Sequence, residues 1–255
     1  MNILYPIVSV IIVSLISVVF AIPFLIKKRI SKRVLLFLLS LSVGVLLATV
    51  FVNFLPEAVS HNYTLGLALN LFLGFLLMFV LEKLVHYHHS KRAENEDFGH
   101  GHAYSLAPVN LIGDGIHNFI DGLVIAGSYA VSTTLGIAAT ISIIFHEVPQ
   151  EIADFGVLLY SGLSKKKALI FNFLSATTAI LGTVFGLLLA GSLQGFNEFI
   201  IPFAAGNFIY IAASNLVPQL HRECSILDTL IHVAAMILGV AIIVVITIFG
   251  PGHSH

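Results

Sequence analysis

The sequence has very few charged residues: only 10% of its 255 positions are Asp, Glu, Lys or Arg, whereas 58% are hydrophobic. A water-soluble domain usually has about a quarter of its residues charged, because polar side chains have to cover its surface. The mean hydropathy of +1.00 agrees with this contrast. The composition therefore excludes a soluble globular domain and predicts an integral membrane protein whose surroundings are the lipid bilayer.

Other absences narrow the class of protein further. The 12 Lys and Arg are balanced by 13 Asp and Glu, so there is no basic excess and we expect no nucleic-acid partner. The single cysteine, Cys224, cannot form an intrachain disulfide. The first apolar run has no basic segment before it and is too long for a signal-peptide core. With no targeting segment and no soluble N-terminal domain, we expect a multi-pass plasma membrane protein, most simply of a prokaryotic inner membrane.

The apolar runs are long enough to span a bilayer eight times, since a spanning helix needs about 20 residues. They cover approximately residues 3–26, 34–58, 62–82, 106–130, 133–161, 168–191, 197–220 and 227–249. All 12 Lys and Arg lie in the connections that follow the odd-numbered spans, and positive charge is retained on the cytoplasmic side. We therefore predict an all-α membrane protein with one domain over residues 1–255, eight transmembrane helices and both termini outside.

A short pattern occurs twice, near the ends of the second and seventh spans. The first copy is Asn53-Phe-Leu-Pro-Glu57 and the second is Asn215-Leu-Val-Pro-Gln219. Because these spans run in opposite directions in this topology, the pattern predicts an inverted repeat of helices 1–3 and 6–8 around a central pair, a 3+2+3 arrangement. The alternative is that proline is simply common near helix ends.

The connection between the third and fourth spans, residues 86–104, is rich in histidine and acidic residues. Imidazole and carboxylate groups suit divalent transition metals, so this cytoplasmic loop is a candidate for capturing such ions. A solvated loop without metal is the alternative. The candidate ligands in it are His86, His88, His89, His100 and His102.

Polar residues form a stripe along the fourth span. They are Asp114, His117, Asn118 and Asp121. Their spacing of i, i+3, i+4 and i+7 places all of them on one face of a helix. An ionisable group at mid-membrane costs several kcal/mol unless it finds a partner or water. The stripe therefore predicts a functional site, and a hydrogen-bonded network that only joins helices is the alternative.

The fifth span carries a second polar stripe around a proline. Its polar members are His146, Glu147, Gln150, Glu151 and Asp154. Pro149 has no N–H and leaves the carbonyl of Phe145 without its helical partner, which should bend the helix within the stripe. Because the fourth and fifth spans are antiparallel neighbours joined by a short turn, we expect His117 and His146 to meet at a similar depth.

The chemistry of the two stripes indicates which ions they would bind. Two imidazoles with carboxylate and amide oxygens, and no thiolate, suit Zn²⁺, Fe²⁺, Mn²⁺, Co²⁺ or Cd²⁺. Imidazole argues against Mg²⁺ or Ca²⁺ as the main ion, because these prefer oxygen ligands. The ion would be bound and carried as substrate, and we expect no resident cofactor.

The two stripes resemble the ZIP family of divalent-metal transporters (Zrt-, Irt-like proteins), of the prokaryotic type. The matching motifs are Gly113-Asp-Gly-Ile-His-Asn-Phe-Ile-Asp-Gly122, His146-Glu-Val-Pro-Gln-Glu-Ile-Ala-Asp-Phe155, Leu55-Pro-Glu-Ala58 and Gly206-Asn-Phe-Ile-Tyr-Ile-Ala212. The resemblance implies a transmembrane transporter that imports zinc, or iron, manganese or cadmium, toward the cytoplasm. It also implies eight helices, with helices 1, 4, 5 and 6 moving against 2, 3, 7 and 8.

The resemblance also implies roles for individual residues. A first metal would be ligated by His117, Asp121, His146 and Gln150, and a second would have Asn118 and Glu147 available, with Glu151 beside them. Gln150 stands where binuclear members have a second bridging carboxylate. We assign Asn53, Glu57, Asp114 and Asp154 to the transport pathway.

Two other functions would use the same residues. His146-Glu147 is the first half of a His-Glu-x-x-His metallohydrolase motif, so an intramembrane zinc-dependent hydrolase is the main alternative. Gln150 in place of the second histidine and Pro149 within the helix oppose it. An ion channel is a further alternative. The oligomeric state stays open, with a homodimer as one assembly.

Overall fold

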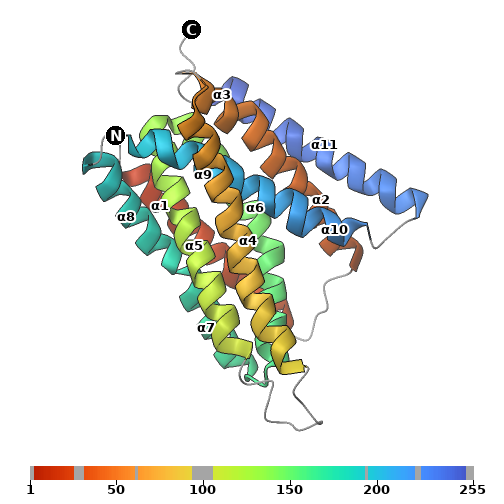
Figure 1. Ribbon diagram of the computed structural model, residues 1–255. Helices are drawn as coiled ribbons and strands as arrows, with labels where there is room; N and C mark the ends of the chain where they lie inside the picture. Colours follow the sequence, from red (N-terminus) through yellow and green to blue (C-terminus); the bar gives the residue numbers. More distant parts are fainter. Residues whose placement is uncertain are drawn as a thin grey trace.

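The computed structural model describes residues 3–25, 32–60, 63–93, 106–192, 195–221 and 225–250, which form a bundle of long helices without strands (Figure 1). The α-helices are α1 (Leu4–Leu25), α2 (Lys32–Ala48), α3 (Leu55–Val59), α4 (Leu65–Ala93), α5 (Leu106–Val131), α6 (Thr133–Tyr160), α7 (Lys165–Ala176), α8 (Thr178–Ser192), α9 (Phe196–Ile209), α10 (Val217–Leu220) and α11 (Ile226–Phe249). Two π-helical segments, η1 (Thr49–Phe54) and η3 (Tyr210–Leu216), complete the chain order.

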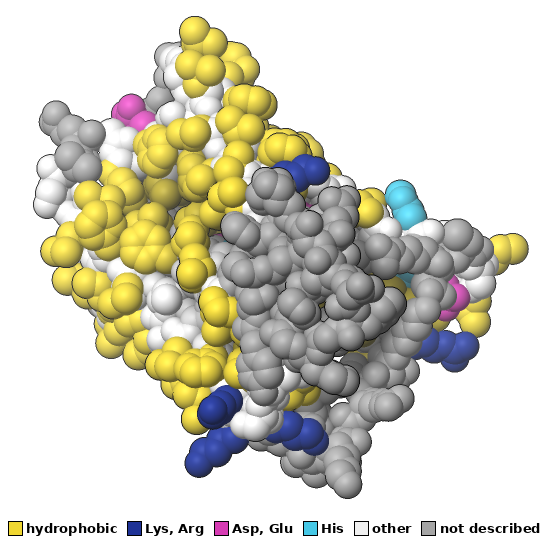
Figure 2. Space-filling view, turned by 60° about the horizontal axis from the view of Figure 1, so that its bottom comes forward, with side chains coloured by type: hydrophobic (Ala, Val, Ile, Leu, Met, Phe, Trp, Pro, Cys, Tyr) yellow, Lys and Arg dark blue, Asp and Glu magenta, His cyan; other side chains and the backbone are white. Residues whose placement is uncertain are grey.

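Five stretches of the described chain are long and apolar enough to cross a membrane. They are Arg33–Val59, Leu65–Leu84, Lys165–Ser192, Glu198–Leu220 and Ile226–Phe249. Hydrophobic side chains cover much of the described part of the face seen in Figure 2, which also carries a few Lys and Arg. On α11, for example, Leu230 and Ile237 are each more than half exposed. An apolar exterior over long apolar helices is what the bilayer requires, so the fold is that of a membrane protein.

The π-helical segments were not expected from the sequence. η1 lies between α2 and α3, and η3 lies between α9 and α10. Each is followed by a short helix whose second residue is proline, Pro56 in α3 and Pro218 in α10. Proline cannot donate to the carbonyl four residues earlier, so the helix widens before it. The two copies of the Asn-x-x-Pro pattern therefore have the same backbone form.

Two pairs of helices approach each other at glycines. Gly44 of α2 and Gly206 of α9 precede their prolines by the same number of residues. A Cβ at Gly44 would lie 2.2 Å from the carbonyl oxygen of Met236 in α11, and a Cβ at Gly206 would lie 1.8 Å from that of Leu71 in α4. Only glycine permits such backbone contact, so α2 packs on α11 in the way that α9 packs on α4.

Some boundaries differ from the predicted spans. The sixth predicted span is divided at Thr177 into α7 and α8. α4 continues to Ala93, beyond the predicted end at residue 82. The first part of the histidine-rich segment 86–104 is therefore helical.

The turn between α5 and α6 sets the geometry of the functional site. Ser132 is the only residue between the two helices, and its hydroxyl caps α6 by accepting from the Leu135 N–H at 3.1 Å. A turn this short makes α5 and α6 antiparallel neighbours. Both ends of the described chain lie near it, since Tyr5 stacks on Tyr129 at a centroid distance of 6.4 Å and Gly250 lies beside Thr134.

Hydroxyl groups of α7 and α8 donate hydrogen bonds to the backbone of α5. Each donates to a carbonyl that is already within the α5 helix: Ser175 to Leu111 at 3.1 Å, Thr178 to Gly115 at 2.6 Å, and Thr183 to Gly122 at 3.1 Å. Polar contacts of this kind join helices where lipid supplies no hydrophobic force between them. They fix the rotation of α5, and with it the direction of the polar stripe.

Candidate metal centre

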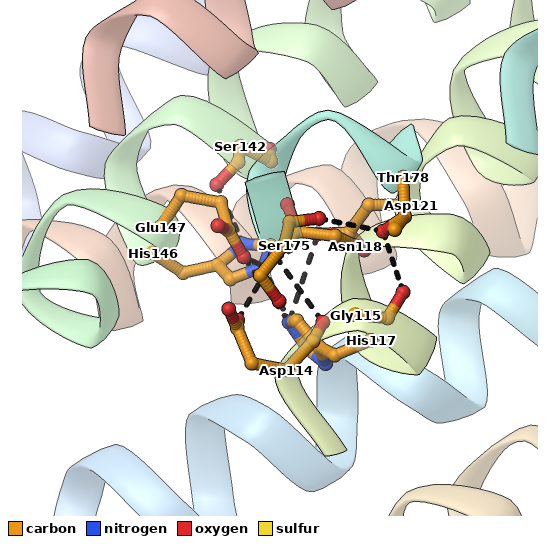
Figure 3. Close-up of polar contacts among 10 residues, drawn as sticks. All are labelled: Asp114, Gly115, His117, Asn118, Asp121, Ser142, His146, Glu147, Ser175 and Thr178. Atoms are coloured by element: carbon orange, nitrogen blue, oxygen red, sulfur yellow. Dashed lines mark hydrogen bonds and ion pairs between the residues drawn. The ribbon is translucent and has the colours of Figure 1, made fainter. Parts of the chain in front are cut away.

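The prediction that His117 and His146 meet is confirmed (Figure 3). Their Nε2 atoms are 3.3 Å apart. Asp121, one turn further along α5, places its Oδ2 3.1 Å from Nε2 of His146 and 3.6 Å from Nε2 of His117. Glu147 places its Oε1 3.3 Å from Nε2 of His117 and 3.6 Å from Nε2 of His146. The four side chains form what we call the four-residue centre.

The four-residue centre has the size of one coordinated cation. Its four donor atoms lie within 4.8 Å of one another, and every one of its side chains is at least 95% buried. Zinc bonds of about 2.0–2.1 Å in a tetrahedron place neighbouring ligand atoms about 3.3 Å apart. The measured separations of 3.1 to 3.6 Å lie on both sides of that value. Two imidazoles and two carboxylates at this spacing suit a divalent transition metal.

His146 is held so that Nε2 faces the centre. Its Nδ1–H donates to the backbone carbonyl of Ser142 at 2.9 Å, which leaves the lone pair on Nε2. The ring of Phe208 from α9 packs against the imidazole, with centroids 5.7 Å apart. These two contacts limit rotation of the ring, as is usual for a histidine that ligates metal.

The carbonyl that Pro149 leaves without a helical partner is satisfied by another helix. Ser42 of α2 donates its hydroxyl to the Phe145 carbonyl at 2.5 Å and also to its own helix at Leu38. Since Phe145 immediately precedes His146, the contact fixes the turn of α6 that carries two of the four centre residues. Ser42 was not predicted to have a role, because a serine in an apolar span has no distinctive sequence signal.

Replacing Ser42 by alanine is expected to destabilise the protein by about 1–3 kcal/mol, because the buried Phe145 carbonyl would lose its donor. Zinc affinity should fall with it, since the His146 turn would be less ordered. Thermal unfolding in detergent and equilibrium zinc binding measure both effects. Ser40→Ala is the matched control: Ser40 is equally buried in α2, but within the described residues it donates only to Leu36 of its own helix. Equal behaviour of the two variants would contradict this role of Ser42.

A second group of carboxylates adjoins the first and shares Glu147 with it. One oxygen each from Asp114, Glu147 and Glu151 lie within 4.8 Å of one another, and all three residues are buried. Asn118 donates to the Asp114 carboxylate at 2.9 Å, and Asn172 of α7 donates to that of Glu151. Within the described residues, Oδ2 of Asp114 and Oε1 of Glu151 have no hydrogen-bond partner. Buried carboxylate oxygens in that condition favour a bound cation.

A cavity of about 390 Å³ extends from the centre toward the ends of α5 and α6 that lie near α7. We call it the His117 cavity, after the centre residue that lines it. Gln150 and Asp154 line it too, and Asn110 donates to the Asp154 carboxylate at 3.0 Å. The structure thus brings these two predicted residues next to the centre, although no hydrogen bond of Gln150 to the histidines is present among the described residues.

Other predicted residues lie elsewhere. Glu57 lines a separate cavity of about 640 Å³, which we call the Glu57 cavity. Glu198 lines it too. Glu198 was not predicted as a site residue, because an acidic residue at a helix start is common. Asn53 accepts a hydrogen bond from Thr247 of α11 at 3.0 Å. Of the candidate loop ligands, the side chains of His86, His88 and His89, and the whole of His100 and His102, lie outside the described part of the chain.

The fold and the centre together define a helical membrane protein with a buried cluster of nitrogen and oxygen donor atoms. The chain belongs to the ZIP zinc transporter family, whose pattern matches residues 2–110 and 101–247. This family assignment agrees with the resemblance noted in the sequence and points to a transporter rather than an enzyme.

Individual relatives agree with the family. The chain is 41% identical to zinc transporter SLC39A7 of Rattus norvegicus over 145 residues, covering 54% of this chain and 31% of the relative. It is 38% identical to zinc transporter zipt-7.2 of Caenorhabditis elegans over 147 residues, 56% of this chain and 32% of the relative. It is 29% identical to the human metal cation symporter ZIP14 over 333 residues, 96% of this chain and 67% of the relative.

The matches also limit what can be carried over. The chain spans about a third of the length of the first two relatives. All three relatives are from animals, so they lend no support to the expected prokaryotic origin.

Proposed function

We propose that this protein transports divalent transition-metal cations, zinc above all, across a membrane through the four-residue centre. The spacing of the four donor atoms, 3.1 to 3.6 Å in the measured pairs, is the observation that carries the proposal. A cluster of ionisable groups buried among membrane helices is energetically costly, and such clusters mark functional sites. The names of the relatives, zinc transporter and metal cation symporter, support the same substrate class.

The membrane topology we propose has eight spans in a 3+2+3 arrangement. α2, η1 and α3 act as one span, as do α7 with α8 and α9 with η3 and α10. The matching glycines, π-helices and prolines of the second and seventh spans support an inverted repeat. Both ends of the described chain lie near the α5–α6 turn, which supports placing both termini on the same side.

Charge and the positions of the cavities support one direction of transport. Lys165, Lys166 and Lys167 begin α7, and positive residues favour the cytoplasmic side. Asn110 and Val157, near that end of α5 and α6, line the His117 cavity. The Glu57 cavity is at the opposite end of α5, where Val131 lines it. The conformation is thus one in which the centre faces the cytoplasm, and we propose release of the ion there.

A second cation is part of the proposal. Asp114, Glu147 and Glu151 would hold it, with Glu147 shared between the two ions. Gln150, whose amide is neutral, would contact a cation from the cavity wall instead of bridging two cations.

A carrier is preferred to a channel because separate cavities lie at the two ends of the bundle. The hydrolase is not favoured, because the second histidine of its motif is absent.

Zinc uptake into proteoliposomes tests the proposal. The purified protein should load zinc saturably, whereas liposomes without protein should not. Glu147→Gln keeps the shape of the side chain but removes a charge common to both groups, so uptake should fall at least about tenfold. Absence of uptake by the wild-type protein with zinc, iron, manganese and cadmium would overturn the proposal. Turnover of a hydrolase substrate that is lost with Glu147→Gln would favour the alternative.

A further inference from the structure

Asn207 of α9 is a deeply buried polar residue. It is 0% exposed, and within the described part of the chain neither the nitrogen nor the oxygen of its amide has a hydrogen-bond partner. Leaving a buried polar group unsatisfied costs about 1–3 kcal/mol. Buried polar groups in proteins almost always have partners, so this exception needs an explanation.

The direction of the Asn207 side chain follows from its neighbours on the same helix face. Ile200 and Ile211 lie seven residues before it and four after it, so all three share one face. Ile200 lies against Gly127 of α5, where a Cβ would be 2.4 Å from it. Ile211 lines the His117 cavity. Asn207 therefore faces α5 between these two points.

The depth of Asn207 is that of the four-residue centre. The next residue, Phe208, packs its ring on the imidazole of His146 at a centroid distance of 5.7 Å. Asn207 also lies between the two cavities along α9, because Ile201 lines the Glu57 cavity and Ile211 lines the His117 cavity. The only other polar side chain between these two isoleucines is that of Tyr210, whose ring packs edge-on against Phe75 of α4 at 5.1 Å.

We propose that Asn207 is a ligand on the path of the cation between the Glu57 cavity and the four-residue centre. This inference rests on the proposed transport function. The amide oxygen would replace one water of a partly dehydrated divalent transition metal as it passes along the seam between α5 and α9. A neutral amide holds a cation less tightly than a carboxylate, and a site on a path has to bind weakly enough for the ion to leave. Asn207 is thereby a metal-contacting residue of the path outside the centre.

Asn207→Leu and Asn207→Ala test this role when zinc uptake and zinc binding are measured on the same preparations. Leucine removes the oxygen and fills the seam, so uptake should fall at least about tenfold, with a smaller loss for alanine. Zinc bound to the purified protein, measured by equilibrium dialysis, should remain at the wild-type level because the centre is intact. Ser128→Ala is the matched control, since Ser128 is also buried in the bundle and its hydroxyl has no partner in the described residues.

The outcomes separate this inference from the proposed function. Wild-type uptake of both Asn207 variants would overturn the inference while leaving the transport function in place. Loss of bound zinc together with uptake would also overturn it, because a residue of the path is not required for zinc to remain in the centre. If Asn207→Leu does not fold, as judged by gel filtration, Asn207→Ala alone decides. Failure of the wild-type protein to take up zinc would instead overturn the transport function.

Discussion

Replacing His117 or His146 by alanine is expected to lower zinc uptake into proteoliposomes at least about 100-fold. Each imidazole supplies one of the four donor atoms of the centre, and even partners that only orient a ligand are worth about 10- to 100-fold. Removal of one histidine also leaves Asp121 and Glu147 with less compensation for their buried charge. Zinc binding by the purified variants should be lost in parallel, which equilibrium dialysis would measure.

His232→Ala is the matched control for this prediction. His232 is a buried histidine of α11, and it is not among the residues grouped around the centre. Its variant should keep zinc uptake close to the wild-type level. A uniform loss in all three variants would mean that any buried histidine is needed for folding. Full uptake by His117→Ala and His146→Ala would remove the four-residue centre from the transport path.

Replacing Gly206 by alanine is expected to cost about 3 kcal/mol of stability, the largest effect on folding that we predict for a single methyl group. The added Cβ would lie 1.8 Å from the Leu71 carbonyl oxygen, so α9 and α4 would have to separate. Forcing extra volume into close packing typically costs about 1–3 kcal/mol, and a backbone atom can yield less than a side chain. Thermal unfolding in detergent measures the loss.

Gly156→Ala is the control for Gly206→Ala. Gly156 is also helical, in α6, but a Cβ there would meet nothing within 4 Å. Alanine should therefore stabilise this helix by up to about 1 kcal/mol through its higher helix propensity. A Gly206→Ala protein as stable as the wild type would show that α4 and α9 can separate without cost, contrary to the packing described above.

The polar stripes of the fourth and fifth spans were predictable because they depend on local periodicity. Four polar residues of α5 share a face by their spacing alone, and the one-residue turn at Ser132 makes α6 its antiparallel neighbour. From these facts the meeting of His117 and His146 follows without knowledge of any other helix. The membrane class followed in the same way from composition, since few charged residues cannot cover a soluble surface.

The partners of these stripes depended on the tertiary structure. Ser42 reaches the Phe145 carbonyl from α2, and Asn172 reaches Glu151 from α7, across long separations in sequence. No local pattern encodes how far a distant helix is rotated about its axis, so neither contact was predictable. The same holds for Asn207, whose position on α9 is meaningful only because that face of α9 lies against α5.

By itself, then, the sequence determined that this protein lies in a lipid bilayer, that it is helical, and which two stripes of residues form the centre. These properties come from composition and from spacing along one helix or two adjacent ones. Tertiary packing alone decided the two cavities, the shared Glu147 and the seam at Asn207. These features need helices that are remote in sequence to meet at one rotation and one depth, which close packing determines.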